Sequence, residues 1–363
     1  MYVFIPKTTS VVARTAIANS PTGEQEMANR KLESASAEQI DSRFGMPIGQ
    51  VNAHLGDELV MRVGIPHKGG HLTAHAFEEG FPVMVSASAF WHPQSGSFKI
   101  PEAANLREMD IALDSAGYTA MKLWQQKGKQ RGMAGTFPWR LGQYVELAGS
   151  MDVSWWSQPD FCVEEDIAST QEEVDFRINA TATLLEGTLR TVYAWQNELA
   201  KDSQLSANAV ANMIRPPVPV IQGWRCSDYL RSLDLLGEVW KRWEPWIAAP
   251  KLIGVGSVCR RSLKNPVHGL HAILAALEGN IPTGSRLHMF GVKGSCLSEL
   301  KMLDWIASAD SMAYDLGARM KALKSGHSNS MRHRSAEMTE WMQTAGKRIK
   351  PSAGDQFRLE LFV

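Results

Sequence analysis

The chain has 363 residues, more than one hydrophobic core usually spans unless the fold is a barrel with added segments. Apolar residues make up 44% and charged residues 21%, which is ordinary for a globular protein. The formal net charge is zero. This excludes strong bulk attraction to a polyanion, so any nucleic-acid site must be a local patch.

The four cysteines have no C-x-x-C spacing and suggest no disulfide framework, which favours a reducing, cytoplasmic compartment. The opening segment MYVFIPKTTS has no charged stretch followed by an apolar one, so no signal peptide is expected. We expect no membrane association, because no run of about 18 apolar residues occurs. Residues 1–57 are rich in small polar residues and proline and predict a lead-in segment, with one polar helix near Glu26–Ile40.

From residue 58 onward, short apolar runs alternate with longer amphipathic segments. The runs are rich in Val, Ile, Phe and Met, as buried parallel strands are. They are Glu58–Val63, Phe81–Ala87, Asp110–Leu113, Met151–Trp156, Pro217–Ile221, Lys251–Val255, Arg286–Phe290 and Ala307–Met312. Repeated alternation of strand and helix implies a parallel sheet, and eight units favour an α/β fold of the (β/α)8 TIM-barrel type over residues 58–318.

Several helix boundaries can be read from capping residues. Ser169-Thr-Gln-Glu172 and Thr170-Gln-Glu-Glu173 each fit a capping box before a long helix to about Lys201. Asn265-Pro266 predicts the start of a helix to Leu277, which Gly279 would end. Ser295 would cap the next helix.

The C-terminal extension, residues 319–363, is basic. Between 319 and 350 only Glu337 and Glu340 oppose a set of cations. That set is Arg319, Lys321, Lys324, Arg332, Arg334, Lys347, Arg348 and Lys350. Taken alone, such a stretch is typical of a solvated helix face.

Polar residues follow the predicted strands at their carboxyl ends, where barrels carry their catalytic groups. Asp114 and Ser115 end one run, and Asp160 follows the next. Taken alone, an aspartate at such a place is more often a turn or a helix cap. We interpret Glu164–Asp166 as the negative start of the following helix.

The later strand ends carry an amide, glycines and a further aspartate. Gln222-Gly223 ends one run, and a glutamine offers both a donor and an acceptor to a base edge. Gly254-Val-Gly256 ends another, where backbone N–H groups could face a ligand, although GxG alone is weak. Phe290-Gly291 lies at the end of the next run, and Asp310 lies at the end of the last one.

This ordered set resembles the tRNA-guanine transglycosylase superfamily, and most closely its phage and bacterial DNA branch, the DpdA-like 7-deazaguanine DNA transglycosylases. The segment Asp114-Ser115-Ala-Gly117-Tyr118 is similar to D-S-G-G-F, and Asp160-Phe-Cys162 to D-E-C. Gln222-Gly223 matches Q-G, and Phe290-Gly291-Val292 resembles M-G-V. Asp310 lies 19 residues after Gly291, which fits the spacing to the nucleophile of the family. The resemblance covers about residues 80–320.

The resemblance implies a ping-pong exchange of guanine for a 7-deazaguanine such as preQ0 or preQ1. Asp310 would be the nucleophile that forms a covalent sugar intermediate, and Asp114 the general acid and base. The base would be held by Asp160 and Gln222 with help from Ser115 and the Gly256 backbone. Phe290 would stack on the ring, and Tyr118 is a weaker pocket candidate. The target nucleotide must leave the duplex stack to be reached.

Enzymes of this superfamily that act on tRNA carry a zinc site of three cysteines and a histidine near the C-terminus. No cysteine follows Cys296 here, so we expect no such zinc and no other cofactor. The departure favours DNA over tRNA. In a base-exchange enzyme, phosphate contact by Arg319, Lys321, Lys324, Arg332 and Arg334 is the better interpretation of the basic extension.

Three alternatives stay open. One is a transglycosylase that acts on tRNA, and another is a barrel that binds nucleic acid without catalysis. The third is a sugar hydrolase with Asp114 and Asp310 as its carboxylates. The sequence does not decide whether the chain works as a homodimer or with an accessory protein, or whether a phage encodes it and it acts in the host cytoplasm.

Overall fold

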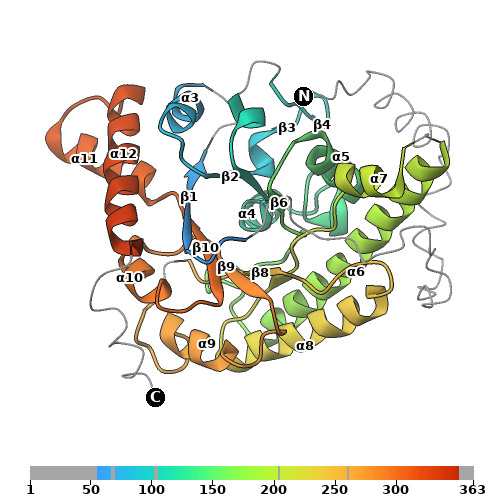
Figure 1. Ribbon diagram of the computed structural model, residues 1–363. Coiled ribbons are helices and arrows are strands. Elements are labelled where there is room, and N and C mark those ends of the chain that lie inside the picture. Colours follow the sequence, from blue (N-terminus) through green and yellow to red (C-terminus); the bar gives the residue numbers. More distant parts are fainter. Residues whose placement is uncertain (1–54, 67–69, 102–104, 203–204, 260, 351–363) are drawn as a thin grey trace. The chain divides into compact units, whose positions relative to one another are not determined.

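The computed structural model describes residues 55–66, 70–101, 105–202, 205–259 and 261–350, and the structural statements below refer to these (Figure 1). Eight parallel strands form one sheet in the order β6-β5-β2-β1-β10-β9-β8-β7. They are β1 (Val60–Ile65), β2 (Val83–Ser86), β5 (Ile111–Asp114), β6 (Trp155–Trp156), β7 (Val220–Ile221), β8 (Leu252–Val255), β9 (Arg286–Met289) and β10 (Ile306–Ser311). Each predicted apolar run overlaps one of them, so the expected α/β barrel is confirmed.

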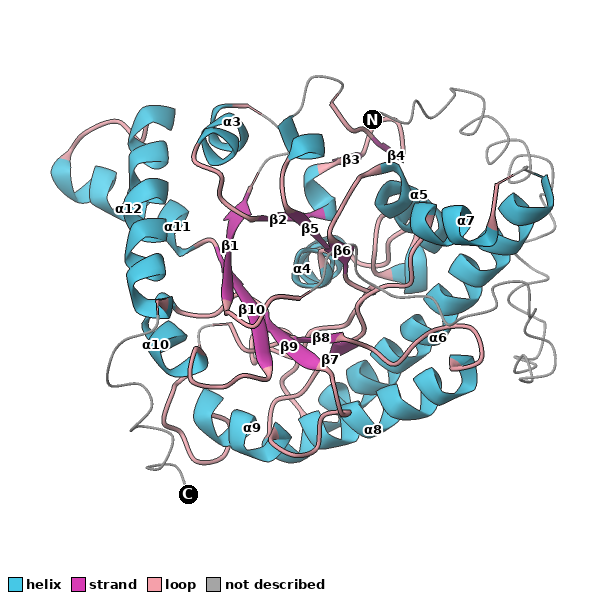
Figure 2. Ribbon diagram, in the orientation of Figure 1, coloured by secondary structure: helices cyan, strands magenta, loops and turns pink. Residues whose placement is uncertain are grey.

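The sheet curls until its two outer strands meet (Figure 2). One parallel bridge joins Ser157, after β6, to Val218, before β7. Val218 N donates to Trp156 O at 2.7 Å, and Gln158 N donates to Val218 O at 2.9 Å. The buried Gln158 side chain extends this seam, because its Oε1 accepts from Val220 N at 3.0 Å. The order around the ring therefore follows the order along the chain.

Helices surround the ring, and α4 is seen end-on within its outline in the view of Figure 2. They are α3 (His71–Glu78), α4 (Gly117–Lys127), α5 (Leu141–Ser150), α6 (Gln171–Asp202), α7 (Ala207–Met213), α8 (Cys226–Trp243), α9 (Leu270–Leu277), α10 (Leu297–Leu300), α11 (Ala313–Ser325) and α12 (Met331–Ile349). A small antiparallel hairpin, β3 (Trp91–His92) and β4 (Ser97–Phe98), is inserted after β2. None of the described helices is long and apolar enough to cross a bilayer.

The inside of the ring is packed rather than hollow. Six side chains from six strands or strand ends form one buried cluster: Met84, Ala112, Trp155, Val218, Leu252 and Ala307. Arg62 of β1 is also buried, with 6% of its surface exposed, and its guanidinium lies 5.7 Å from the Trp155 ring centroid. Its charge is balanced by Asp110, 2.9 Å away. Burial lowers the pKa of Arg62, and the Asp110 carboxylate opposes that shift.

The structure confirms some of the predicted helix boundaries and contradicts others. The long helix is confirmed as α6, with Thr170 Oγ1 accepting from Glu173 N and the Glu173 carboxylate accepting from Thr170 N. The predicted start at Asn265 is wrong, because the Asn265 side chain instead accepts from Val267 N and His268 N in a turn, and α9 begins at Leu270. Gly279 has a φ of 72° just past α9, as a stop requires.

The two remaining helix predictions concern Ser295 and residues 26–40. Ser295 caps no helix with its side chain, because a 3-10 turn, Gly294–Cys296, precedes α10. The predicted helix at 26–40 lies outside the described residues, as does most of the lead-in segment, residues 1–57.

The basic extension does not begin at a boundary between elements, because residue 319 lies inside α11, the helix that follows β10. Asp315 in the first turn of α11 is buried, with 1% of its side chain exposed. Its carboxylate accepts from Arg334 Nε of α12 at 2.6 Å and also binds Arg319. This carboxylate joins α11 to α12.

We predict that Asp315→Ala lowers the free energy of unfolding by about 3–5 kcal/mol, because it leaves the largely buried Arg334 without its anion. Denaturant unfolding of the purified protein measures this. The matched control is Asp175→Ala, which breaks the half-exposed Asp175–Arg231 pair at 2.6 Å and is expected to cost less than about 1 kcal/mol. Equal losses in both variants would contradict the structural role of Asp315.

Candidate active site

The candidate site lies at the carboxyl ends of the strands. Asp114 is the last residue of β5, and Asp160 follows β6 by four residues. Gln222 directly follows β7, and Asp310 is the fifth residue of β10. Because parallel strands end at one rim of the ring, these four side chains converge from separate parts of the chain.

A hydrogen-bonded chain links the predicted base-binding residues. Ser115 Oγ donates to Asp160 Oδ1 at 2.6 Å, and Gln222 Nε2 donates to Asp160 Oδ2 at 2.5 Å. Gln222 Oε1 accepts from Ser257 Oγ at 2.6 Å, so the orientation of the amide is fixed. Ser115 and Gln222 have at most 1% of their surface exposed and Asp160 has 9%. Each oxygen of Asp160 keeps a lone pair for a ligand donor.

Asp114 lies beside this chain on a strained turn. Its Oδ2 accepts from Ala116 N at 3.0 Å. Ala116 has a φ of 67°, in the left-handed region, which costs a residue with a side chain about 1 kcal/mol. The family pattern has glycine at this position. Gly117 is required by close approach, since a Cβ there would lie 2.6 Å from Asp160 O.

Asp310 is held by two donors on one of its oxygens. Oδ1 accepts from Gly291 N at 2.9 Å and lies 3.3 Å from His288 Nε2. The other ring nitrogen, His288 Nδ1, lies 2.8 Å from Ser308 Oγ. His288 is fully buried, and burial lowers its pKa although the Asp310 carboxylate opposes the shift.

Asp114 and Asp160 lie in a poorly solvated part of the rim, which raises their proton affinity. Burial raises the pKa of Asp114 to about 6, and the charge of Asp310 adds to the shift. Burial also raises the pKa of Asp160 to about 7, with a contribution from the charge of Asp114, although Ser115 and Gln222 stabilise its ionised form. Asp114 and Asp160 therefore hold protons more tightly than solvated aspartates do, as is common for carboxyl groups at functional sites.

Three glycines of the predicted site make room for side chains. A Cβ on Gly256 would lie 2.1 Å from Gln222 Nε2, one on Gly254 2.5 Å from the Phe290 ring, and one on Gly223 2.8 Å from the Tyr229 ring. The Gly256 peptide is itself engaged, because its N–H pairs with Ile221 O and its carbonyl accepts from Tyr229 OH.

The two aromatic candidates lie in different surroundings. The Phe290 ring packs into the top of the barrel, with its centroid 4.6 Å from that of His288 and 6.4 Å from that of Trp155. Tyr118 on α4 is 41% exposed, and its hydroxyl donates to Asp166 Oδ2 at 2.9 Å. The structure brings Phe290, but not Tyr118, to the interior of the barrel.

Glu164 is not the start of a helix, because α6 begins seven residues later, at Gln171. It belongs to a turn instead, and its Oε2 lies 3.2 Å from Ser257 Oγ. Burial raises the pKa of Glu164. The expected start of the helix at Glu164–Asp166 is thus wrong, and Glu164 instead adjoins the Ser257–Gln222 contact.

The predicted nucleic-acid residues fall into two groups. Arg319 and Arg334 bind Asp315, and Lys321 binds Glu337 at 2.6 Å and Glu340 at 3.1 Å. Lys324 and Arg332 are exposed, and neither has an ion pair within the described ranges. Lys324 and Arg332 are therefore the freest of the five to meet a phosphate.

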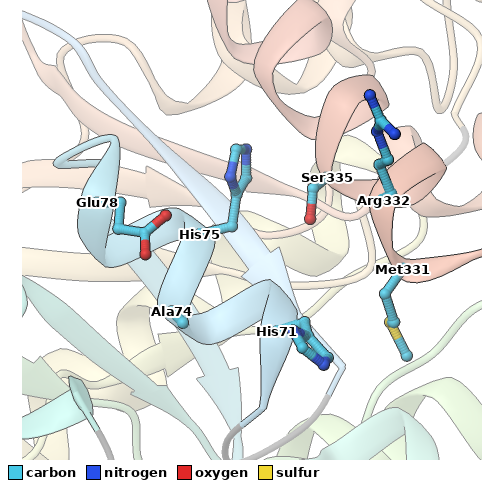
Figure 3. A pocket seen from close by; sticks show the side chains of 7 residues that line it. All are labelled: His71, Ala74, His75, Glu78, Met331, Arg332 and Ser335. Atoms are coloured by element: carbon cyan, nitrogen blue, oxygen red, sulfur yellow. The ribbon is translucent and has the colours of Figure 1, made fainter.

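Arg332 lines a surface cleft of about 330 Å³ between α3 and α12. Figure 3 shows His71, Ala74, His75 and Glu78 of α3 on one wall and Met331, Arg332 and Ser335 of α12 on the other. His75 Nε2 lies 2.7 Å from Thr339 Oγ1, which ties the two helices together. The cleft contains none of the predicted catalytic residues.

In the described part of the chain, no group of three or more His, Cys, Asp or Glu side chains is arranged to hold a metal ion. His327 and His333 contact each other with ring centroids 4.6 Å apart. His333 Nε2 lies 3.0 Å from Ala318 O, so that nitrogen faces a backbone carbonyl of α11.

Sequence reasoning did not single out His288 and Ser257. His288 could have been noticed from the sequence, because it lies two residues before Phe290. It therefore shares the inward face of the buried strand β9, where an imidazole is unusual. Ser257 had no such signal, because its role depends on the approach of Gln222 from another strand. It has a φ of 54°, which marks it as strained.

We predict that Gly256→Ala destabilises the protein by about 1–3 kcal/mol, because the new methyl group overlaps the buried Gln222 amide. Gly237→Ala in α8 is the control, since a Cβ there meets nothing within 4 Å. That change is expected to gain up to about 1 kcal/mol. Thermal unfolding of both variants measures the difference, and equal stabilities would show that Gln222 is free to move aside.

Comparison with known proteins gives one family. A search of curated proteins found no match to this chain. The family model DpdA, described as DeoxyPurine in DNA protein A, matches residues 68–356, which is most of the chain. The match spans every strand end described above except that of β1. The chain therefore belongs to the DpdA family, whose members are transglycosylases related to 7-deazaguanine in DNA.

Proposed function

We propose that this chain exchanges guanine in DNA for a 7-deazaguanine base of the preQ0 or preQ1 type, through a covalent bond between Asp310 and the sugar. One observation carries the proposal: Asp114 and Asp310 lie close enough to interact electrostatically at the same rim as the Ser115–Asp160–Gln222 chain. A nucleophile, an acid and base, and an acceptor-rich edge for a flat base are thereby combined.

The base-recognition step follows from the fixed donors and acceptors. Ionised Asp160 accepts from N1–H and N2–H of guanine with its remaining lone pairs. Gln222 Nε2 has a second proton, which donates to O6. A 7-deazaguanine presents the same edge, so one site accepts both the leaving and the incoming base. Phe290 supports the ring from the barrel side.

In the first half-reaction, Asp310 attacks C1′ of the nucleotide and the C1′–N9 bond breaks. The electron pair stays on the departing guanine, and protonated Asp114 supplies the proton. In the second half, ionised Asp114 removes a proton from the incoming base, which attacks C1′ and returns the electron pair of the ester bond to Asp310. A pKa of about 6 lets Asp114 serve in both directions.

The DNA itself must be held at its phosphates, since the target nucleotide leaves the stack. Lys324 and Arg332 are the first candidates for this contact, and Arg319, Lys321 and Arg334 would have to exchange internal ion pairs for phosphate. We propose that the reaction takes place in the cytoplasm, without zinc or another cofactor. Whether a second copy or an accessory protein takes part is a question for the same assay.

The test is incorporation of labelled preQ0 and preQ1 into duplex DNA and into tRNA, followed by nucleoside mass spectrometry. We expect modified deoxyguanosine, and no modified tRNA. Asp310→Asn should lower exchange at least about a thousandfold, because the amide is no nucleophile. Denaturing electrophoresis should show a protein–DNA adduct for the unaltered protein and none for the variant.

Asp304→Asn is the control, since Asp304 is an exposed aspartate before β10, at the opposite end of that strand from the site. It should retain exchange. Modification of tRNA alone would overturn the substrate assignment, and exchange by folded Asp310→Asn would overturn the nucleophile. Release of free guanine without insertion would instead indicate a hydrolase.

Base binding should depend on pH through Asp160. Its pKa is raised to about 7, so the carboxylate that accepts N1–H and N2–H is formed as pH rises through that value. Calorimetric titration with 7-deazaguanine should therefore give tighter binding at pH 8 than at pH 6. Asp160→Asn should bind weakly and with little pH dependence, whereas binding that weakens with rising pH would contradict this role.

A further inference from the structure

His288 is a buried imidazole between two polar groups, and the exchange reaction above assigns it no task. It lies on β9, and the polar groups next to its two ring nitrogens are both on the neighbouring strand β10. Nδ1 is 2.8 Å from Ser308 Oγ, and Nε2 is 3.3 Å from Asp310 Oδ1. None of its surface is exposed, and the rings of Trp155 and Phe290 pack against it edge-on.

The proton on this imidazole can be placed from its neighbours. Asp310 Oδ1 already accepts from Gly291 N at 2.9 Å, so it is an acceptor. A proton on Nε2 satisfies the contact with an ionised carboxylate, whereas a bare Nε2 would face it lone pair to lone pair. Nδ1 then accepts the Ser308 hydroxyl proton. Burial in an apolar site favours this neutral form.

We propose that Ser308 and His288 form a positioning pair that aims the nucleophile. Ser308 donates to Nδ1 and holds the ring, His288 Nε2–H and Gly291 N–H anchor Oδ1 of Asp310, and Oδ2 is left as the attacking oxygen. Within the described residues Oδ2 accepts no hydrogen bond. The inference rests on the proposed function, because it needs Asp310 to be the nucleophile.

The same pair acts in both halves of the exchange. When Oδ2 bonds to C1′ and guanine departs with the electron pair, Oδ1 becomes the carbonyl oxygen of the ester and keeps its two donors. When the incoming base attacks C1′, the C1′–Oδ2 pair returns to the carboxylate. The donors on Oδ1 then stabilise the restored charge, which makes Asp310 a better leaving group.

Two other charged groups bear on the charge of this pair. Arg62 on β1 is paired across the ladder with Asp310 and repels a proton from His288. Asp114 on β5 lies close enough to Asp310 for the charge of Asp310 to raise the pKa of Asp114. Loss of the His288 donor therefore removes a stabilising contact from the Asp310 carboxylate, while Arg62 and Asp114 stay in place.

The first test reads the tautomer without any activity. Nitrogen-15 NMR of the histidine-labelled protein should show a neutral ring protonated at Nε2. Its signal is assigned among the ten histidines by its absence in His288→Gln. Ser308→Ala leaves Nδ1 without its donor, so the Nδ1 signal should move while Nε2 stays protonated. Protonation at Nδ1 in the unaltered protein would overturn the inference whatever the enzyme does.

The second test separates positioning from folding. Ser308→Ala and His288→Leu should each lower kcat for guanine exchange about ten- to a hundredfold, with KM for DNA and for base unchanged. The acidic limb of the pH–rate profile should move to higher pH. His288→Gln can still donate to Oδ1 and should recover part of the rate. Equal rates for the Leu and Gln variants would overturn the proposal.

Ser285→Ala is the matched control, because Ser285 is a buried serine whose hydroxyl donates to Pro250 O at the opposite end of β9. It should leave kcat unchanged. A protein that forms no DNA adduct even when unaltered would refute the proposed function, whereas an adduct together with unchanged kcat in Ser308→Ala would refute only the positioning pair.

Discussion

Asp160 and Gln222 meet across the seam between β6 and β7, where the ring is closed by a single bridge. Each of these strands is only two residues long, and the buried Gln158 side chain supplies a hydrogen bond that a longer ladder would have made with backbone. Ser157 on the same seam accepts from Ser115 N, which fixes the strand end that carries Asp114. The site depends on this closure, because Asp114, Asp160 and Gln222 are all held in place by residues on or next to the seam.

Burial of negative charge is the second constraint. Asp114 and Asp160 lie at a rim where low solvation opposes ionisation, and burial raises their pKa values to about 6 and about 7. The groups that donate to the rim carboxylates are a serine, an amide, backbone N–H groups and, in the proposed tautomer, the neutral His288 ring. Neutral donors stabilise the ionised form of a carboxyl group less strongly than a neighbouring cation does, so the group can still take up a proton. Such a rim suits the proton transfers of the proposed reaction, whereas the Asp315 carboxylate is paired with two arginines.

The sequence predicted the ring well, since buried parallel strands are continuous apolar runs whatever their partners. It also placed Asp114, Asp160, Gln222 and Asp310 at strand ends. It could not show that glycines 254 and 256 make room for Phe290 and Gln222, because the contact crosses between strands. The partner of Arg334 was equally hidden, since Asp315 lies 19 residues earlier and outside the basic stretch.

The fixed amide of Gln222 has a consequence for selectivity between purines. Ser257 occupies its oxygen, so Gln222 and ionised Asp160 together offer one donor and two acceptors in a set order. Adenine would bring the bare nitrogen N1 against the carboxylate and an amino group against the amide N–H. Both contacts are repulsive, and neither partner can rotate to relieve them. In the proposed function, discrimination against adenine follows from these two contacts of like polarity, and mismatched buried polar groups of this kind can reject an analogue by about 10⁴-fold.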